Sequence, residues 1–528
     1  MRRIGRPAVL FAICCIAIPV SARVLGQLGK VNFPTSCAPE VQATLEKGLA
    51  LLHSFQYLES EQTFTEAAKQ DPQCAMAHWG KAMAPYHQLW DFPQASTLKK
   101  GLDEIEQAQK SSSLTDRERA YLAAAAAFYQ DNPKLSHAER TQAYSSALAK
   151  LHGQFPEDNE AAAFYALSLV ALADVEHLDD LANRKKAISI LDPLFRRDPG
   201  NPGIAHYLIH ATDVPELAPL GLEAARRYAR IAPDSSHALH MPSHIFSRLG
   251  LWQESIASNV AAAASAAHAT QMHTADAHYQ FHAMDFLAYA YLQSGEEAKA
   301  RQVAADGKNV PGTRGEEAAN RQASLDIAIA LELHRWKDAA ALPVPAVRAV
   351  WQDSTYWARA IGAARSGDVA AAKMDLKKLK KIVKAREAHS KESGYEVSRE
   401  KATDLREAEA WLAFAEGKTD DAVKELRAAA DRQDAKGVDT IGIPAREMLA
   451  DMLLELKRPA EALAEYKIAL KESPNRFDAL YGAARSAQAA GNSAAAQSFY
   501  SKLAEISGPG ADRPELAETK SYLARQSN

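Results

Sequence analysis

The sequence is poor in aromatic residues, which make up only 7 % of its 528 residues. A β-sandwich or β-barrel of this length would need many more aromatic and β-branched side chains on its sheet faces. Charge of one sign is also lacking, since 62 Lys+Arg stand against 66 Asp+Glu. This balance gives no reason to expect a nucleic-acid partner. Alanine-rich stretches at 123–127 and 261–264 favour closely packed helices, so we expect an all-α protein.

Long apolar runs are absent, apart from one near the N-terminus. Arg2, Arg3 and Arg6 precede an uncharged apolar stretch at 8–20, and the small residues Ala22 and Gly26 follow it. This order is typical of a secretory signal peptide, and the stretch is too short for an ordinary membrane span. We therefore expect residues 1–26 to be a signal peptide. The mature chain is then exported, to a periplasmic or extracellular location, and has no membrane span.

Cysteine is scarce, with four residues, of which Cys14 and Cys15 lie in the predicted signal peptide. The other two, Cys37 and Cys74, either form one disulfide in an oxidising compartment or remain separate buried thiols. Familiar catalytic motifs are missing as well. The sequence has no His-Glu-x-x-His, Gly-x-Ser-x-Gly, Cys-x-x-Cys or phosphate-binding glycine loop. Any enzyme activity would have to be built on the histidines.

What the sequence does contain is an internal repeat. Ala462 and Tyr466 are followed 34 residues later by Ala496 and Tyr500. A small residue at a helix crossing with an aromatic four residues later, at this period, is the tetratricopeptide pattern. Each such unit is a helix-turn-helix that buries its apolar face by stacking on its neighbours. We predict a tetratricopeptide-type solenoid of helical hairpins wound as a right-handed superhelix.

The repeats differ in regularity along the chain. We expect irregular tetratricopeptide-like repeats over residues 39–370 and regular repeats over 402–528. Between them, residues 371–401 carry many lysines and then a polar stretch. This composition indicates either a charged connector or one long helix with a solvated face.

Four stretches of the sequence, residues 74–83, 237–244, 444–451 and 474–485, resemble a widespread group of exported bacterial tetratricopeptide-repeat proteins. The resemblance covers nearly the whole mature chain and implies the solenoid fold and export. The group has no agreed activity, so the resemblance implies neither a reaction nor a substrate.

The histidines show a pattern of their own. Three His-x-x-x-His pairs follow one another at steps of 34 and 38 residues, which is close to the repeat length, and each pair is followed three residues later by Asp213, Ser247 or Asp285. Positions i, i+4 and i+7 share one helical face, so successive repeats would direct their imidazoles into one concave pocket. The candidate metal ligands are His206, His210, Asp213, His237, His240, His244, His278, His282 and Asp285.

Three interpretations of this pattern remain open. The pairs could chelate a divalent transition metal (Zn, Cu, Ni or Fe), hydrogen-bond a ligand in the groove, or only bridge helices. We favour an exported scaffold that binds a protein, peptide or small ligand in its concave groove and holds a metal ion in a His-lined pocket. The alternative is a metal-dependent, hydrolase-like enzyme in which Asp213 or Asp285 serves as ligand or base.

Overall fold

The computed structural model describes residues 27–89, 93–130, 134–176, 181–272, 277–311, 315–393, 400–435 and 437–526. The predicted signal peptide at 1–26 lies outside these ranges. Within them the regular elements are helices, and no strand occurs. No helix in this described part is both long enough and apolar enough to cross a bilayer.

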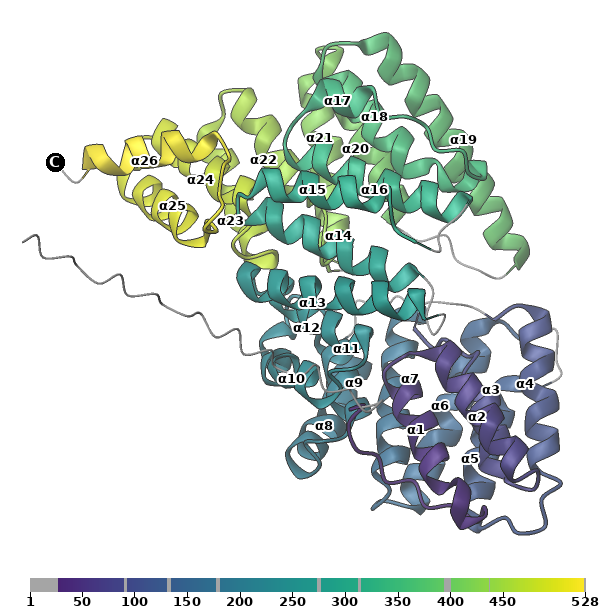
Figure 1. The fold of residues 1–528 in the computed structure, drawn as a ribbon. Coiled ribbons are helices and arrows are strands. Elements are labelled where there is room, and N and C mark those ends of the chain that lie inside the picture. Colours follow the sequence, from purple (N-terminus) through teal and green to yellow (C-terminus); the bar gives the residue numbers. More distant parts are fainter. Residues whose placement is uncertain are drawn as a thin grey trace, which may run out of the picture.

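In the first half of the chain, each helix packs against the next one (Figure 1). A short 3-10 helix, η1 (Pro39–Val41), precedes this series. The helices are α1 (Gln42–His53), α2 (Tyr57–Gln70), α3 (Ala75–Met83), α4 (Ala95–Ala108), α5 (Asp116–Tyr129), α6 (His137–Gln154), α7 (Asn159–Glu176), α8 (Ala182–Arg197), α9 (Pro202–Thr212), α10 (Ala218–Ile231), α11 (Ser236–His240) and α12 (Pro242–Arg248).

The second half continues in the same way, with a second 3-10 helix, η2 (Ala349–Trp351), before α18. Its helices are α13 (Trp252–Gln271), α14 (His278–Gln293), α15 (Glu297–Gly307), α16 (Glu316–Glu332), α17 (Trp336–Ala340), α18 (Asp353–Arg365), α19 (Val369–Ser393), α20 (Glu400–Ala415), α21 (Thr419–Asp434), α22 (Ala445–Glu455), α23 (Pro459–Glu472), α24 (Phe477–Ala489), α25 (Ser493–Ile506) and α26 (Glu515–Gln526).

The small and aromatic residues of the repeat meet where helices cross. The ring of Phe64 on α2 packs against Gly48 of α1 and Gly80 of α3, and a Cβ atom on Gly80 would lie 2.3 Å from that ring. Tyr466 packs against Gly482 in the same manner, with 2.2 Å left for a Cβ atom. The repeat spacing therefore follows from close packing, in which the second helix of one hairpin lies against its own first helix and the first helix of the next hairpin.

The hydrophobic core follows the chain in successive clusters, as expected for a stacked array. One cluster extends from Phe33 to Phe246, the next from Trp252 to Ile329, and a third from Ala360 to Tyr522. The lysine-rich segment contributes to the third cluster, because α19 buries Leu376 and Leu379 there. Helix α19 is thus packed between α18 and α20 and is one long amphipathic helix over its described residues.

The C-terminal helices return to the middle of the chain, and Figure 1 shows them beside the teal helices α13 and α14. The indole Nε1 of Trp252 donates to the backbone oxygen of Asn475 at 2.7 Å. The backbone N–H of Gly508 donates to the oxygen of Ser294 at 2.8 Å. These contacts join segments more than 200 residues apart and hold α24 against α14.

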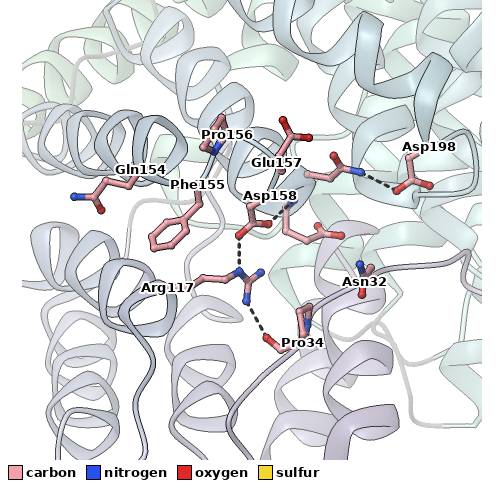
Figure 2. A pocket seen from close by; sticks show the side chains of 11 residues that line it. Asn32, Pro34, Arg117, Gln154, Phe155, Pro156, Glu157, Asp158 and Asp198 are labelled. Carbon is pink, nitrogen blue, oxygen red and sulfur yellow. Dashed lines mark hydrogen bonds and ion pairs between the residues drawn. The ribbon is translucent and has the colours of Figure 1, made fainter.

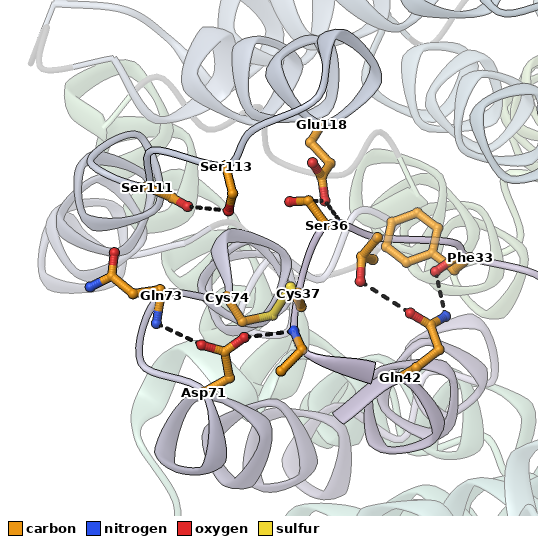
Figure 3. Close-up of a disulfide and its surroundings, with 12 residues drawn as sticks. Phe33, Ser36, Cys37, Gln42, Asp71, Gln73, Cys74, Ser111, Ser113 and Glu118 are labelled. Carbon is orange, nitrogen blue, oxygen red and sulfur yellow. Dashed lines mark hydrogen bonds between the residues drawn. A yellow bond between two sulfur atoms is a disulfide. The ribbon is translucent and has the colours of Figure 1, made fainter. Parts of the chain in front are cut away.

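A disulfide joins Cys37 to Cys74 at the N-terminal end of the array (Figure 3). It ties the segment before α1 to the start of α3. Asp71 reinforces the link, because its carboxylate accepts backbone N–H groups from Ala38 at 2.9 Å and from Gln73 at 3.0 Å.

Removing this disulfide is expected to destabilise the N-terminal hairpins. The bond closes a loop with a sequence separation of 37 residues, and such a cross-link contributes about 2–4 kcal/mol by restricting the unfolded chain. Urea denaturation of the Cys37→Ser/Cys74→Ser variant should show this loss, and added reductant should change only the parent. A variant as stable as the oxidised parent would contradict the prediction.

Candidate metal centre

Six imidazoles from four helices come together in the middle of the array. They form two groups, and within each group one ligand atom from every ring lies within 4.8 Å of the other two. The first His group takes its members from α9 and α11, and the second from α11, α12 and α14. The first comprises His206, His210 and His237, and the second comprises His240, His244 and His282.

In the first His group, the Nε2 atom of His206 is the meeting point. It lies 3.0 Å from Nε2 of His210 and 3.1 Å from Nε2 of His237. The other ring nitrogen of His206, Nδ1, lies 2.6 Å from the backbone oxygen of His53. A carbonyl only accepts, so Nδ1 donates and the neutral ring keeps a lone pair on Nε2. A tetrahedral ion with Zn–N bonds of about 2.0–2.1 Å separates its nitrogen ligands by ~3.3 Å, close to the spacing here.

In the second His group, the Nδ1 atoms of His240 and His244 both donate hydrogen bonds. His240 Nδ1 donates to Asn259 Oδ1 at 2.7 Å, and His244 Nδ1 donates to Asp213 Oδ2 at 2.7 Å. The Asn259 amide is fixed because its Nδ2 donates to the Ser255 oxygen at 2.9 Å. The Nε2 atoms of His240 and His244 then face each other at 3.0 Å with lone pairs on both. Such a pair repels unless a proton or a metal cation lies between the two nitrogens.

The carboxylate of Asp213 is fixed in position by hydrogen bonds. It accepts from Arg248 Nε at 2.9 Å and from Thr440 Oγ1 at 3.1 Å. Burial alone would raise the pKa of Asp213, but the neighbouring His244 and Arg248 lower it well below its usual range. Because Thr440 lies in the segment between α21 and α22, the C-terminal array contacts the carboxylate that orients His244.

Burial controls the charge of the imidazoles. It lowers the pKa of His206 and of His240 to about 3, and it lowers the pKa of His210, His237 and His282 well below the ordinary histidine value. At neutral pH these five rings are therefore uncharged. The neutral ring is the form that binds a metal ion, since a protonated nitrogen has no lone pair to donate.

Comparisons with known proteins identify the architecture. Residues 407–477 and 447–512 each match the tetratricopeptide-repeat family model. The C-terminal part of this chain therefore contains tetratricopeptide repeats. The prediction of an all-α tetratricopeptide solenoid is confirmed by this match together with the stacked hairpins of the structure.

Sequence comparison with curated proteins finds no match. Similar solved structures include a tetratricopeptide-repeat protein from Parabacteroides merdae, with 14 % identity and a TM-score of 0.30, covering 56 % of this chain and 99 % of that one. The human IFIT1 dimer with PPP-AAAA is similar at 11 % identity and a TM-score of 0.38, covering 86 % and 94 %. Naa15/Naa10 bound to HypK is similar at 12 % identity and a TM-score of 0.23, covering 92 % and 73 %.

Three of the predicted ligands lie outside the two His groups. His278 lies outside both His groups, half exposed, with its Nδ1 2.6 Å from Arg321. Asp285 is also outside them, and burial raises its pKa to about 7 although Arg321 lowers it. Asp213 belongs to neither group; its carboxylate holds His244 of the next hairpin and does not extend the His206 face. The hydroxyls of Ser247 and Ser255 are hydrogen-bonded at 3.1 Å.

Several residues of the site carry no signal in the sequence. Phe55 is one of them, with its ring centre 4.4 Å from His206, 5.5 Å from His210 and 5.7 Å from His237. Asn259 and His53 orient rings from other helices. None of these residues shares the spacing of the pairs, because their contacts cross between hairpins.

Phe55 also has an unusual backbone, with φ of 53° in the turn between α1 and α2. A glycine occupies the corresponding turn between α12 and α13, where Gly250 has φ of 64°. Phenylalanine is strained in this left-handed region, whereas glycine adopts it freely. Phe55, whose ring covers the first His group, therefore occupies a turn position where the backbone conformation alone would favour glycine.

Substituting Phe55 tests this balance. Both Phe55→Ala and Phe55→Gly remove the ring, but alanine keeps the strained conformation, so the alanine variant should be about 1 kcal/mol less stable than the glycine variant. Urea denaturation of the two variants side by side measures the difference. Equal stability, or a more stable alanine variant, would contradict the strain.

A cavity of about 440 Å³ lies beside the N-terminal hairpins (Figure 2). Its acidic residues already have partners. Arg117 Nε donates to Asp158 at 2.6 Å, and Glu160 contacts His53 Nε2 at 2.6 Å and accepts from Asn201 at 2.8 Å. These groups hold the α7 end and position His53 beneath the first His group, so we assign the cavity a structural role.

Proposed function

We propose that this tetratricopeptide-repeat protein is an exported scaffold that binds a transition metal through its His groups. The observation that carries the proposal is the facing pair of Nε2 atoms on His240 and His244, 3.0 Å apart, with both Nδ1 atoms used as donors. Imidazoles held by a carboxylate or amide on the far nitrogen are the usual arrangement around protein-bound metals.

The donor set indicates which metals are suitable. All six rings supply nitrogen, and no carboxylate or thiol belongs to either His group. Nitrogen-only sites suit Zn, Cu, Ni or Fe and disfavour Ca and Mg, which require oxygen ligands.

Elemental analysis of untagged protein tests the proposal. The purified parent should carry a transition metal, and metal-stripped protein should melt at a higher temperature when Zn²⁺ is added, because the ion binds only the folded chain. The variant His240→Ala/His244→Ala should show a smaller shift. Absence of metal together with an unchanged melting temperature would overturn the proposal.

Export is supported by the arginine-flanked apolar stretch at 8–20 and by the disulfide between Cys37 and Cys74. Mass spectrometry of the chain from a periplasmic or secreted fraction should find its N-terminus near residue 23 or 27. Recovery of the uncleaved chain from the cytoplasm alone would overturn export.

A further inference from the structure

We infer that the His cluster holds two transition-metal ions, one in each His group. This inference rests on the proposed metal binding and adds the number of ions and the ligands of each.

The first argument is the reach of a single ion. Zn–N bonds of about 2.0–2.1 Å place all ligands of one ion within ~4.2 Å of each other. The six histidines fall into two sets that meet a 4.8 Å limit, and not into one set of six. Three imidazoles are also the ligand number of many metal sites that keep one position for water or another ligand.

The second argument is the direction of the lone pairs. His206 uses Nδ1 as a donor to the His53 oxygen, so its one free lone pair points to His210 and His237. His240 uses Nδ1 as a donor to Asn259, so its lone pair points to His244. The lone pairs of His206 and His240 therefore point to two different positions. Each position is also faced by other imidazole nitrogens of the same His group.

The third argument is that each group has its own surroundings. Phe55 covers the first group. Phe286 covers the second, with its ring centre 4.9 Å from His240, 4.5 Å from His244 and 5.3 Å from His282. The orienting acceptors are separate as well, since the first group uses a backbone oxygen and the second uses Asn259 and Asp213. The groups are nevertheless neighbours, with ring centres of His237 and His240 6.1 Å apart.

The test is metal stoichiometry. Untagged, metal-stripped protein is loaded with Zn²⁺, dialysed and analysed for zinc per chain, and the parent should retain two ions. His210→Ala and His282→Ala form a matched pair, because each removes one partly buried ring from a different group. Each variant should retain one ion. His278→Ala, which lies outside both groups, should retain two.

The outcomes separate this inference from the proposal beneath it. One zinc per parent chain, or loss of all zinc in both single variants, would overturn the two-ion centre and leave metal binding intact. No zinc in the parent would instead overturn the proposed function. Circular dichroism checks folding, and His210→Gln with His282→Gln, which better preserve side-chain volume, replace any alanine variant that does not fold.

Discussion

Replacing Arg476 with methionine is expected to lower the free energy of unfolding by about 3–5 kcal/mol, because it leaves two buried carboxylates without their counter-charge. Arg476 is 0 % exposed and is the N-cap residue of α24. Its guanidinium pairs with Glu447 of α22 at 2.7 Å and with Glu332 of α16 at 3.0 Å. The same group donates to the Tyr289 hydroxyl of α14 at 2.7 Å. One side chain thus joins the C-terminal repeats to the middle of the array.

The loss of stability caused by Arg476→Met should increase with pH. Burial raises the pKa of Glu447 to about 7, although Arg476 lowers it, so removal of Arg476 raises that pKa further. In the folded parent this carboxyl releases its proton near pH 7, whereas the folded variant keeps it to higher pH. The deficit relative to the parent therefore grows above about pH 7, by about 1.4 kcal/mol per unit for this group, until the folded pKa of the variant is reached.

Urea denaturation at pH 5 and pH 8 checks both parts of this prediction. Arg485→Met is the matched control, since Arg485 is exposed on the same helix, and its effect should stay within about 0.5 kcal/mol. A control variant as unstable as Arg476→Met, or a deficit that does not change with pH, would show that the buried ion pairs are not the cause.

The second large effect concerns the carboxylate behind His244. Asp213→Asn is expected to weaken the proposed metal binding about 10- to 100-fold, because it removes the charged acceptor that holds the His244 ring and its tautomer. The substitution removes the carboxylate that pairs with Arg248, so stability should fall as well. Competition for Zn²⁺ against a coloured chelator measures the dissociation constant.

Asp285→Asn provides the comparison. Asp285 follows its own pair at the same spacing as Asp213, but it lies outside both His groups, and among the described contacts no histidine donates to it. Its substitution should leave the metal affinity within about twofold, below the 0.5 kcal/mol expected of a remote change. Equal weakening by both variants would refute the specific role of Asp213.

The contrast between these two aspartates shows how much of the site the sequence predicts. The spacing of His206, His210, His240 and His244 puts the two pairs on neighbouring hairpins, because the pairs repeat with the hairpins that stack. The same spacing treats Asp213 and Asp285 as equivalent, which they are not. Their roles depend on which neighbour faces them, and for Asp213 the neighbours include Thr440, 227 residues away.

Both His237 and His278 were predicted ligands, and the structure places only His237 in a His group, for a similar reason. His237 stands one turn before the middle pair, and its Nε2 reaches His206 across the gap between α11 and α9. His278 begins α14 and lies against Arg321 of α16 instead. A periodic pattern assigns positions to a helix face, but small differences in where each helix begins decide which rings meet.

The sequence by itself determined the helical composition, the repeat and the clustering of histidine pairs, because these follow from local spacing and from stacking of neighbours. Only the tertiary structure decided the division into two His groups, the acceptors that orient their rings, and the contact of the C-terminal repeats with Asp213 and Glu332. Those features depend on hydrogen bonds between segments tens to hundreds of residues apart, and their geometry is set by packing between hairpins, which no local spacing encodes.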